Sequence, residues 1–165
     1  MVTSKRKKKQ FTYHRVEPVE GETPLGKCTG CRTCEVVCSF FREGECNPEL
    51  AGIRIQENAI EWARDTEPQI YKRLVCNQCG VCMSVCPVEA MKRSEKTAAI
   101  LIDDAKCNRC KLCIRACPFD AIWFDAHSNR IIKCDLCEGV SGGPQCVAFC
   151  PSKASRQVTV EDVIA

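Results

Sequence analysis

Cysteine is the most prominent reactive residue in this sequence, and the spacing between cysteines is repeated along the chain. The chain has 165 residues, of which 17 are cysteines. The segment CNQCGVCMSVCP begins at Cys76, and CNRCKLCIRACP begins at Cys107 with the same skeleton. Thiolates that recur at intervals of two or three residues can bind a metal centre together. The number of such copies therefore decides how many centres the chain can hold.

The cysteines fall into four groups of four, and only Cys46 is left over. Groups one to three share the spacing C-x2-C-x2-C-x3-C, whereas group four is stretched between its second and third cysteines. Proline follows the last cysteine of groups two, three and four. In chain order the groups are Cys28, Cys31, Cys34 and Cys38; Cys76, Cys79, Cys82 and Cys86; Cys107, Cys110, Cys113 and Cys117; and Cys134, Cys137, Cys146 and Cys150.

The shared spacing is that of the bacterial ferredoxin run, which binds [4Fe–4S] clusters. Three thiolates two residues apart lie on a tight loop that can wrap one cluster and turn backbone N–H groups toward its sulfides. The fourth thiolate, after a three-residue gap, points away from this loop and ligates the cluster of a partner run. Proline then fixes φ, removes an N–H donor and turns the chain away. The sequence therefore predicts four [4Fe–4S] clusters as cofactors.

The same logic predicts crossed ligation, in which groups two and three pair with each other, as do groups one and four. The predicted ligand sets, which are also the predicted iron ligands, are Cys76, Cys79, Cys82 and Cys117; Cys107, Cys110, Cys113 and Cys86; Cys28, Cys31, Cys34 and Cys150; and Cys134, Cys137, Cys146 and Cys38. A structure in which each group closes on itself would contradict this prediction.

Zinc and disulfides are the alternatives to iron–sulfur clusters. Zinc sites of four cysteines are common, but zinc ribbons separate two C-x2-C pairs by a longer loop. Disulfide frameworks belong to secreted chains, and residues 1–24 are basic without an apolar signal segment. An odd number of cysteines also fits complete pairing poorly. The pattern therefore favours iron–sulfur binding in a reduced, cytoplasmic compartment.

The composition predicts a small fold with a thin ordinary core. Aromatic residues make up only 6% of the chain, and cysteines account for part of its 45% apolar fraction. Chains of this kind need metal or disulfides to hold them. We expect an α+β, ferredoxin-like fold of two pseudo-twofold bicluster units with short strands and helices. Strands are expected over residues 52–58 and 98–104, a hairpin over 121–134, and helical turns after the third cysteine of each group.

The predicted organisation places one long insertion inside the metal-binding domain. The main parts are a basic N-terminal arm (1–25), a four-cluster domain (26–155) and a C-terminal tail (156–165). The domain divides into a central bicluster unit (76–118), an outer bicluster unit (28–38 plus 134–150) and the insertion (39–75). The insertion has two explanations, a cover over the clusters or a docking surface.

Other reactive residues are given ordinary explanations. Lys5–Lys9 is expected to be a solvated arm, with partner docking and nucleic acid as alternatives. The formal net charge of +3 is too small to imply nucleic acid or membrane by itself. No stretch is apolar over the roughly 20 residues of a membrane span. Cys46 is expected to be a free, partly buried thiol, with a ligand role as the alternative. Surface or packing roles are expected for His14, His127, Trp62 and Trp123.

With these motifs the chain resembles the polyferredoxin-like small subunits that serve larger redox enzymes, over residues 26–155. The opening block CTGCRTCEVVCSFFREGECNPELAGIRI resembles small subunits paired with tungsten enzymes of the aldehyde:ferredoxin oxidoreductase type, including aldehyde oxidoreductase complexes and the ATP-independent benzoyl-CoA reductase. Iron–sulfur subunits of dimethyl sulfoxide reductase-type molybdenum enzymes also have four motifs. They generally insert residues where Cys79 and Cys82 here have only two between them.

The resemblance implies a non-catalytic electron-transfer subunit of an anaerobic oxidoreductase complex. Its partner would be a larger catalytic subunit with a tungsten or molybdenum cofactor, together with a ferredoxin or a flavoprotein subunit, and without nucleic acid. The sequence has no P-loop and no Gly-rich dinucleotide turn. The alternatives are a free-standing polyferredoxin, although such carriers are typically strongly acidic, and a metal-stabilised binding protein.

Charge in the loops also predicts a difference in reduction potential. Positive charge near a cluster favours its reduced form and raises its potential. The loop of group three carries Arg109, Lys111 and Arg115. The matching positions of group two are uncharged: Gln78, Gly80 and Ser84. We therefore predict the higher potential of the central pair for the cluster of group three, unless these side chains point into solvent and are screened.

Overall fold

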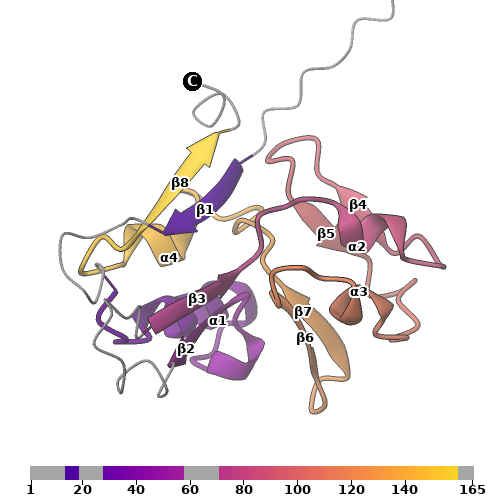
Figure 1. The fold of residues 1–165 in the computed structure, drawn as a ribbon, viewed down its shortest axis with the longest axis horizontal. Helices are drawn as coiled ribbons and strands as arrows, with labels where there is room; N and C mark the ends of the chain where they lie inside the picture. The colour runs from indigo at the N-terminus through magenta and orange to yellow at the C-terminus, as the bar shows by residue number, and fades with distance from the viewer. Residues whose placement is uncertain (1–13, 19–27, 58–70, 160–165) are drawn as a thin grey trace, which may run out of the picture.

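The computed structural model describes residues 14–18, 28–57 and 71–159, and it has the predicted α+β fold (Figure 1). Its helices are α1 (Thr33–Glu43), the 3-10 helix η1 (Pro48–Leu50), α2 (Val81–Ser84), α3 (Leu112–Arg115) and α4 (Gln145–Ala148). Its strands form four antiparallel pairs, β1 (His14–Pro18) with β8 (Ser155–Thr159), β2 (Ile53–Glu57) with β3 (Tyr71–Val75), β4 (Met91–Arg93) with β5 (Ile100–Ile102), and β6 (Ile122–Asp125) with β7 (Arg130–Lys133). The short strands and helices were expected from the sequence.

The helices begin slightly earlier than the sequence suggested. Helical turns were expected after the third cysteine of each group, but each helix has that cysteine as its second residue. The reason is visible before α1, α2 and α3, where Arg32, Gly80 and Lys111 have φ of 57°, 93° and 61°. A left-handed residue reverses the chain within one step, so the helix starts at once and carries the third thiol on its first turn.

The strand predictions are confirmed where the structure describes them. The hairpin over residues 121–134 is β6 and β7, with Trp123 opposite Ile132 and Phe124 opposite Ile131. Strand β5 lies inside the predicted segment 98–104, and β2 lies inside 52–58. The sequence did not predict β1, β3, β4 or β8, because none of them shows a clear alternation of apolar and polar residues.

Helices that belong to distant parts of the chain pack in pairs. Helix α1 contacts α4, and α2 contacts α3. Figure 1 shows the first pair beside β1, β8, β2 and β3; in the second pair, α2 lies beside β4 and β5, and α3 lies beside β6 and β7. Group one therefore lies next to group four, and group two next to group three.

The pairing of β1 with β8 crosses both of the predicted domain boundaries. Strand β1 lies within the proposed N-terminal arm, and β8 runs from Ser155 into the proposed tail. Val16 of β1 is 3% exposed and packs with Cys38 and Cys134 in the main core. The boundaries themselves stay predictions, and Lys5–Lys9 and Trp62 lie outside the described residues.

Cysteine contributes a substantial part of the core, as the thin apolar composition led us to expect. One cluster of buried side chains includes Cys38, Cys76, Cys134 and Cys146, and another includes Cys82 and Cys113. Trp123 is buried against Leu50 and Ile132, as expected for a packing residue. His127 is exposed, as expected. Cys46 is also exposed, so the prediction of a partly buried thiol was wrong.

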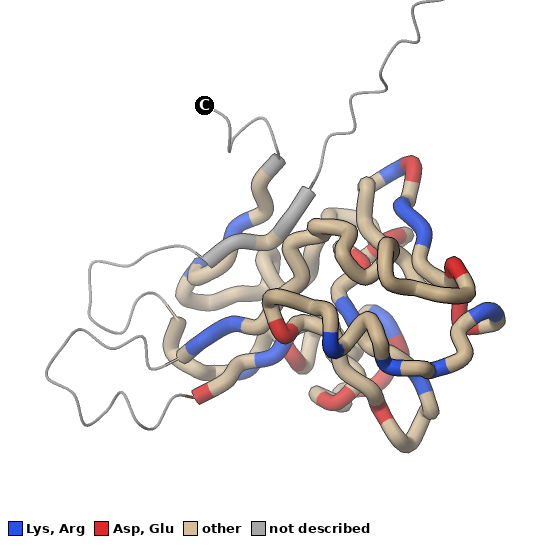
Figure 2. The backbone as a smooth tube through the Cα atoms, turned by 45° about the vertical axis from the view of Figure 1, so that its right-hand side comes forward, with Lys and Arg blue, Asp and Glu red and all other residues tan. Residues whose placement is uncertain are grey.

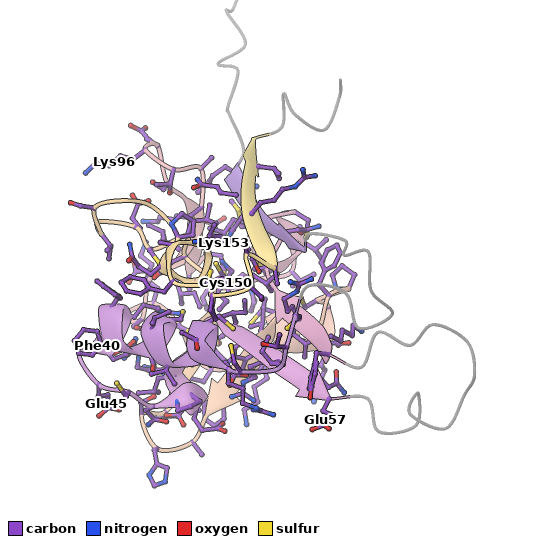
Figure 3. The ribbon with its side chains drawn as sticks, turned by 90° about the vertical axis from the view of Figure 1, so that its left-hand side faces the viewer. Phe40, Glu45, Glu57, Lys96, Cys150 and Lys153 are labelled. Carbon is purple, nitrogen blue, oxygen red and sulfur yellow. The ribbon has the colours of Figure 1, made fainter. Side chains whose placement is uncertain are left out.

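Charged and aromatic residues also mark the surface. Figure 2 shows basic and acidic positions interspersed along the described backbone, without separation into two faces. Phe40 of α1 is 50% exposed, and Phe149, which follows α4, is 52% exposed. Figure 3 shows Phe40 on the outer side of α1, with Cys150 on the same side of the molecule. The surface over α1 and α4 is therefore partly aromatic.

Candidate iron–sulfur sites

Every cysteine group has a residue in the left-handed conformation at the same position of its first turn. The residue two positions after the first cysteine has positive φ in all four groups: Gly30 (70°), Gln78 (61°), Arg109 (58°) and Leu136 (56°). A left-handed conformation is unfavourable for a side chain other than glycine, so its recurrence indicates one shared loop geometry. Alternation of left- and right-handed residues turns successive N–H groups into a concavity that binds anions, including iron–sulfur clusters.

A second recurring turn holds the fourth cysteine of groups two, three and four. Its sequence is C-P-x-x-A, and the alanine N–H donates to the cysteine sulfur. The N···Sγ distances are 3.3 Å for Ala90 to Cys86, 3.4 Å for Ala121 to Cys117, and 3.2 Å for Ala154 to Cys150. An N–H that donates to sulfur favours the thiolate, which is the form that ligates iron.

Cys38, the fourth cysteine of group one, is held differently because it lies within α1 and no proline follows it. Its sulfur accepts a hydrogen bond from the N–H of Gly52, with an N···Sγ distance of 3.2 Å. A Cβ at Gly52 would lie 2.8 Å from Cα of Cys134. Gly52 therefore lets the backbones of groups one and four come together, and nothing in the sequence singled it out.

Two of the predicted ligand sets line pockets of the structure. One pocket is lined by Cys28, Cys31, Cys34 and Cys150, together with Thr33 and Arg73. A second is lined by Cys86, Cys107, Cys110 and Cys113, together with Arg109 and Lys111. In each pocket the first three cysteines of one group meet the fourth cysteine of the partner group.

The third predicted set converges on Cys82. Burial raises the pKa of the Cys82 thiol, and the Lys133 ammonium opposes this rise. Neighbouring thiols raise the pKa further, namely those of Cys76, Cys79 and Cys117. Charges shift a pKa in this way over short distances. The structure therefore brings Cys117 of group three beside the first three cysteines of group two.

The fourth predicted set converges on Cys146. Burial raises the pKa of this thiol well above its ordinary value. Negative charge on nearby thiols raises it further, and these belong to Cys134, Cys38, Cys137 and Cys34. Cys38 of group one therefore lies among the first three cysteines of group four, and the presence of Cys34 places the two outer sites close together.

The donors fit iron–sulfur clusters in their chemistry. Burial is the main cause that raises the pKa of Cys34 to about 12 and the pKa values of Cys113 and Cys137 to about 11. Such thiols keep their protons at neutral pH unless a metal replaces them. Soft sulfur donors, anion-binding loops and N–H groups directed at sulfur together suit a cluster with one thiolate on each iron. Among the described residues, no three His, Cys, Asp or Glu are arranged around a single metal ion.

The charged residues of the group-three loop fold back onto the protein. Arg109 donates from Nε to the carbonyl oxygen of Asn129 at 3.0 Å and from a terminal nitrogen to that of Cys107 at 2.5 Å. The Lys111 ammonium lies 3.9 Å from the centre of the Phe124 ring. Lys111 is nevertheless an exposed residue. Water and salt therefore screen at least part of its charge.

Two buried charges lie beside the cysteine groups and were missed in the sequence. Lys133 is 2% exposed and immediately precedes Cys134, at the end of β7. Glu35 is also 2% exposed, next to Cys34 in α1. Its carboxylate accepts from the N–H of Ile55 at 2.6 Å and lies 3.4 Å from a guanidinium nitrogen of Arg32. Charged residues are usually exposed, so nothing in the sequence indicated that either one is inside.

Comparison with known proteins also indicates that the chain binds iron–sulfur clusters. A family described as "4Fe-4S dicluster domain" matches residues 69–160, and a second family with the same description matches residues 27–90. The chain belongs to the 4Fe-4S dicluster domain family. Two such domains imply four [4Fe–4S] clusters, and the cysteine groups supply enough ligands for them.

Relatives and solved structures point in the same direction. The chain is 37% identical over 126 residues, 75% of its own length and 66% of the relative's, to the "Aliphatic sulfonate oxidoreductase, polyferredoxin-like subunit" of Pyrococcus furiosus. It is 34% identical to one polypeptide of the anaerobic dimethyl sulfoxide reductase of Escherichia coli, over 78% of this chain and 67% of that polypeptide. Its fold matches a polypeptide of the BamBC complex of benzoyl coenzyme A reductase, with a TM-score of 0.51 and 21% identity over 91% of this chain and 78% of that one. Among the described residues, no helix could span a membrane.

Proposed function

We propose that this chain is a non-catalytic electron-transfer subunit that connects a catalytic oxidoreductase subunit with an external carrier or a further subunit. When bound, [4Fe–4S] clusters supply sites that accept and release one electron at a time. The observation that supports the proposal is the position of the cysteines. Two pockets each bring three thiols of one group to one thiol of its partner group, and Cys82 and Cys146 each lie near thiols of their partner groups.

We propose as ligands the four crossed sets that the spacing predicted. The residues around them have three tasks, which are to hold the thiolates, to direct N–H groups at sulfur and to exclude water. Burial of Cys82, Cys113, Cys134 and Cys146 serves the third task. With four thiolates on each cluster, no iron position is left open for a substrate, which supports a role in electron transfer over one in catalysis.

The catalytic partner is proposed to be a tungsten or molybdenum enzyme. The likeness to subunits of a sulfonate oxidoreductase and of a dimethyl sulfoxide reductase supports a partner of this general kind. The short spacing between Cys79 and Cys82, together with the opening block, favours the tungsten type. Exposed Phe40 and Phe149 support a protein contact over α1 and α4, because exposed apolar groups often mark interaction sites.

The first experiment is to measure iron, acid-labile sulfide and zinc in anaerobically purified chain. Four clusters require about sixteen iron and sixteen sulfide per chain. About twelve of each, under conditions that prevent loss, would mean that one site is not of this kind. Zinc without sulfide would contradict the proposal altogether.

The second experiment separates a subunit from a free carrier. The chain is purified anaerobically under native conditions from its own cells and passed over a sizing column. A subunit elutes in a larger complex that contains tungsten or molybdenum, whereas a free polyferredoxin elutes alone near its own mass of 18.4 kDa.

A further inference from the structure

Lys133 is the most deeply buried cation among the described residues that surround the cysteine groups. Its Nζ donates to the carbonyl oxygens of Ile100 at 2.5 Å and Cys134 at 2.6 Å, and it lies 3.4 Å from Oε1 of Gln78. These three acceptors match the three N–H donors of an ammonium group. The side chain is therefore held in the interior as a fully hydrogen-bonded cation.

The Lys133 ammonium forms no ion pair with a carboxylate among the described residues, although Asp104, Asp135 and Glu138 line the same cavity. All three of its acceptors are neutral. Two arginines that line the same cavity of about 270 Å³ differ, because Arg42 lies 3.4 Å from a carboxylate oxygen of Asp135 and Arg130 lies 2.9 Å from one of Glu43. Lys133 thus keeps a net positive charge in a region where screening is weak.

The position of Lys133 places this charge between two of the proposed ligand sets. It is bonded to the carbonyl of Cys134, in the outer set, and to the side chain of Gln78, in the loop from Cys76 to Cys79. The N–H of Gln78 in turn donates to the sulfur of Cys76 at 3.4 Å.

We propose that Lys133 is a redox-tuning residue that raises the reduction potentials of the two sites that flank it. These are the site of Cys76, Cys79, Cys82 and Cys117 and the site of Cys134, Cys137, Cys146 and Cys38. Reduction adds negative charge, and a fixed cation nearby stabilises the reduced form. This inference rests on the proposed cluster sites and adds a residue that is not a ligand.

The proposal changes the order of potentials that the loop charges alone suggested. Arg109 and Lys111 favoured the cluster of group three, but Lys111 is exposed. Lys133 acts from the interior on group two, whose own loop is uncharged. A buried charge is screened less than an exposed one. We therefore infer that the site of group two has a potential at least as high as that of group three.

The test is an anaerobic redox titration, followed by electron paramagnetic resonance, on the full iron-loaded chain and on variants of Lys133. Lys133→Met and Lys133→Gln both remove the charge, and the latter keeps a hydrogen-bond donor. Lys133→Arg keeps the charge, and Lys92→Met is the control, because Lys92 is an exposed lysine on β4. We expect both uncharged variants to lower the reduction potentials of the two flanking sites. The expected change is about tenfold in the equilibrium constant of reduction, or about 59 mV for a one-electron couple.

The outcomes separate tuning from assembly. Iron and sulfide are measured first, so a wild-type chain without clusters contradicts the proposed function and not the tuning alone. Fully loaded Lys133→Gln with unshifted potentials would overturn the tuning role. If both uncharged variants lose their clusters while Lys133→Arg keeps its clusters and unshifted potentials, then Lys133 has a structural role. That result would also overturn the tuning role.

Discussion

The spacing of the cysteines does not predict which charged residues lie buried beside their sulfur atoms. Glu35 and Lys133 are both 2% exposed, have opposite charges and lie next to different cysteine groups. Burial raises the pKa of the Cys34 thiol to about 12, and the negative charge of Glu35 is the next cause of that rise. The cysteines decide that clusters can bind, whereas such neighbours would decide how readily each cluster is reduced.

Replacement of Glu35 by glutamine is expected to raise one potential. Glu35→Gln removes a buried negative charge beside Cys34, which Arg32 offsets only in part because its own side chain is 55% exposed, and it keeps an oxygen to accept from Ile55. The proposed site of Cys28, Cys31, Cys34 and Cys150 should become easier to reduce, by about tenfold in equilibrium or about 59 mV. The measurement is the same titration. Glu57→Gln, at an exposed position on β2, is the control, and an equal shift in both variants would count against a local effect.

Gly52 supports a second prediction at the scale of one residue. In Gly52→Ala the new Cβ would lie 2.8 Å from the Cys134 backbone, so the outer site must open. We expect about 1–3 kcal/mol of lost stability, as for other overpacked positions, and loss of about four of sixteen irons per chain. Iron analysis and thermal unfolding measure both effects. Gly44→Ala is the control, since Gly44 has φ of 79° and open space around it; it should lose some stability and no iron.

At the scale of elements, the two recurring turns explain how short helices and hairpins hold sulfur atoms in place. The left-handed residue after each first cysteine shapes the loop, and the C-P-x-x-A turn fixes the fourth cysteine. The spacing predicted which groups pair, because the three-residue gap before the fourth thiol is a local property. It did not predict β1 and β8, since their pairing depends on contacts between residues far apart in the chain.

Much of the remainder depended on tertiary contacts that one sequence does not reveal. Gly52 looked like any glycine before a strand, and its importance comes from the approach of Cys134. Lys133 follows two isoleucines at the end of a strand and was not expected inside. The third copy of the C-P-x-x-A motif, CPSKA at Cys150, is present in the sequence, but no turn was predicted from it. It would have identified Ala154 as a donor to sulfur.

Crossed ligation itself gives a prediction about paired elements. Cys117→Ser removes a thiol of group three. In the proposed sets, however, Cys117 is a ligand of the iron site beside Cys76 and Cys79, so that site should lose iron. Anomalous diffraction at the iron edge, on anaerobically grown crystals, should show reduced iron occupancy there and full occupancy beside Cys107. Cys86→Ser is the matched reciprocal variant and should give the reverse. If each variant depletes the site of its own group, ligation is not crossed.

At the scale of the whole molecule, the iron–sulfur clusters are expected to take the place of a hydrophobic core. The main core cluster contains Cys38, Cys76, Cys134 and Cys146, with few large apolar side chains around them. Without metal these thiols keep their protons, and only helix contacts and a few hydrogen bonds join the four groups. Metal binding and folding are coupled in such sites. We expect removal of iron by a chelator to unfold the chain as a whole. Circular dichroism and hydrogen exchange, followed against remaining iron, should show strands and helices lost together. If the iron-free chain keeps its exchange protection in β6 and β7, the polypeptide folds without the clusters. The clusters would then not replace a hydrophobic core.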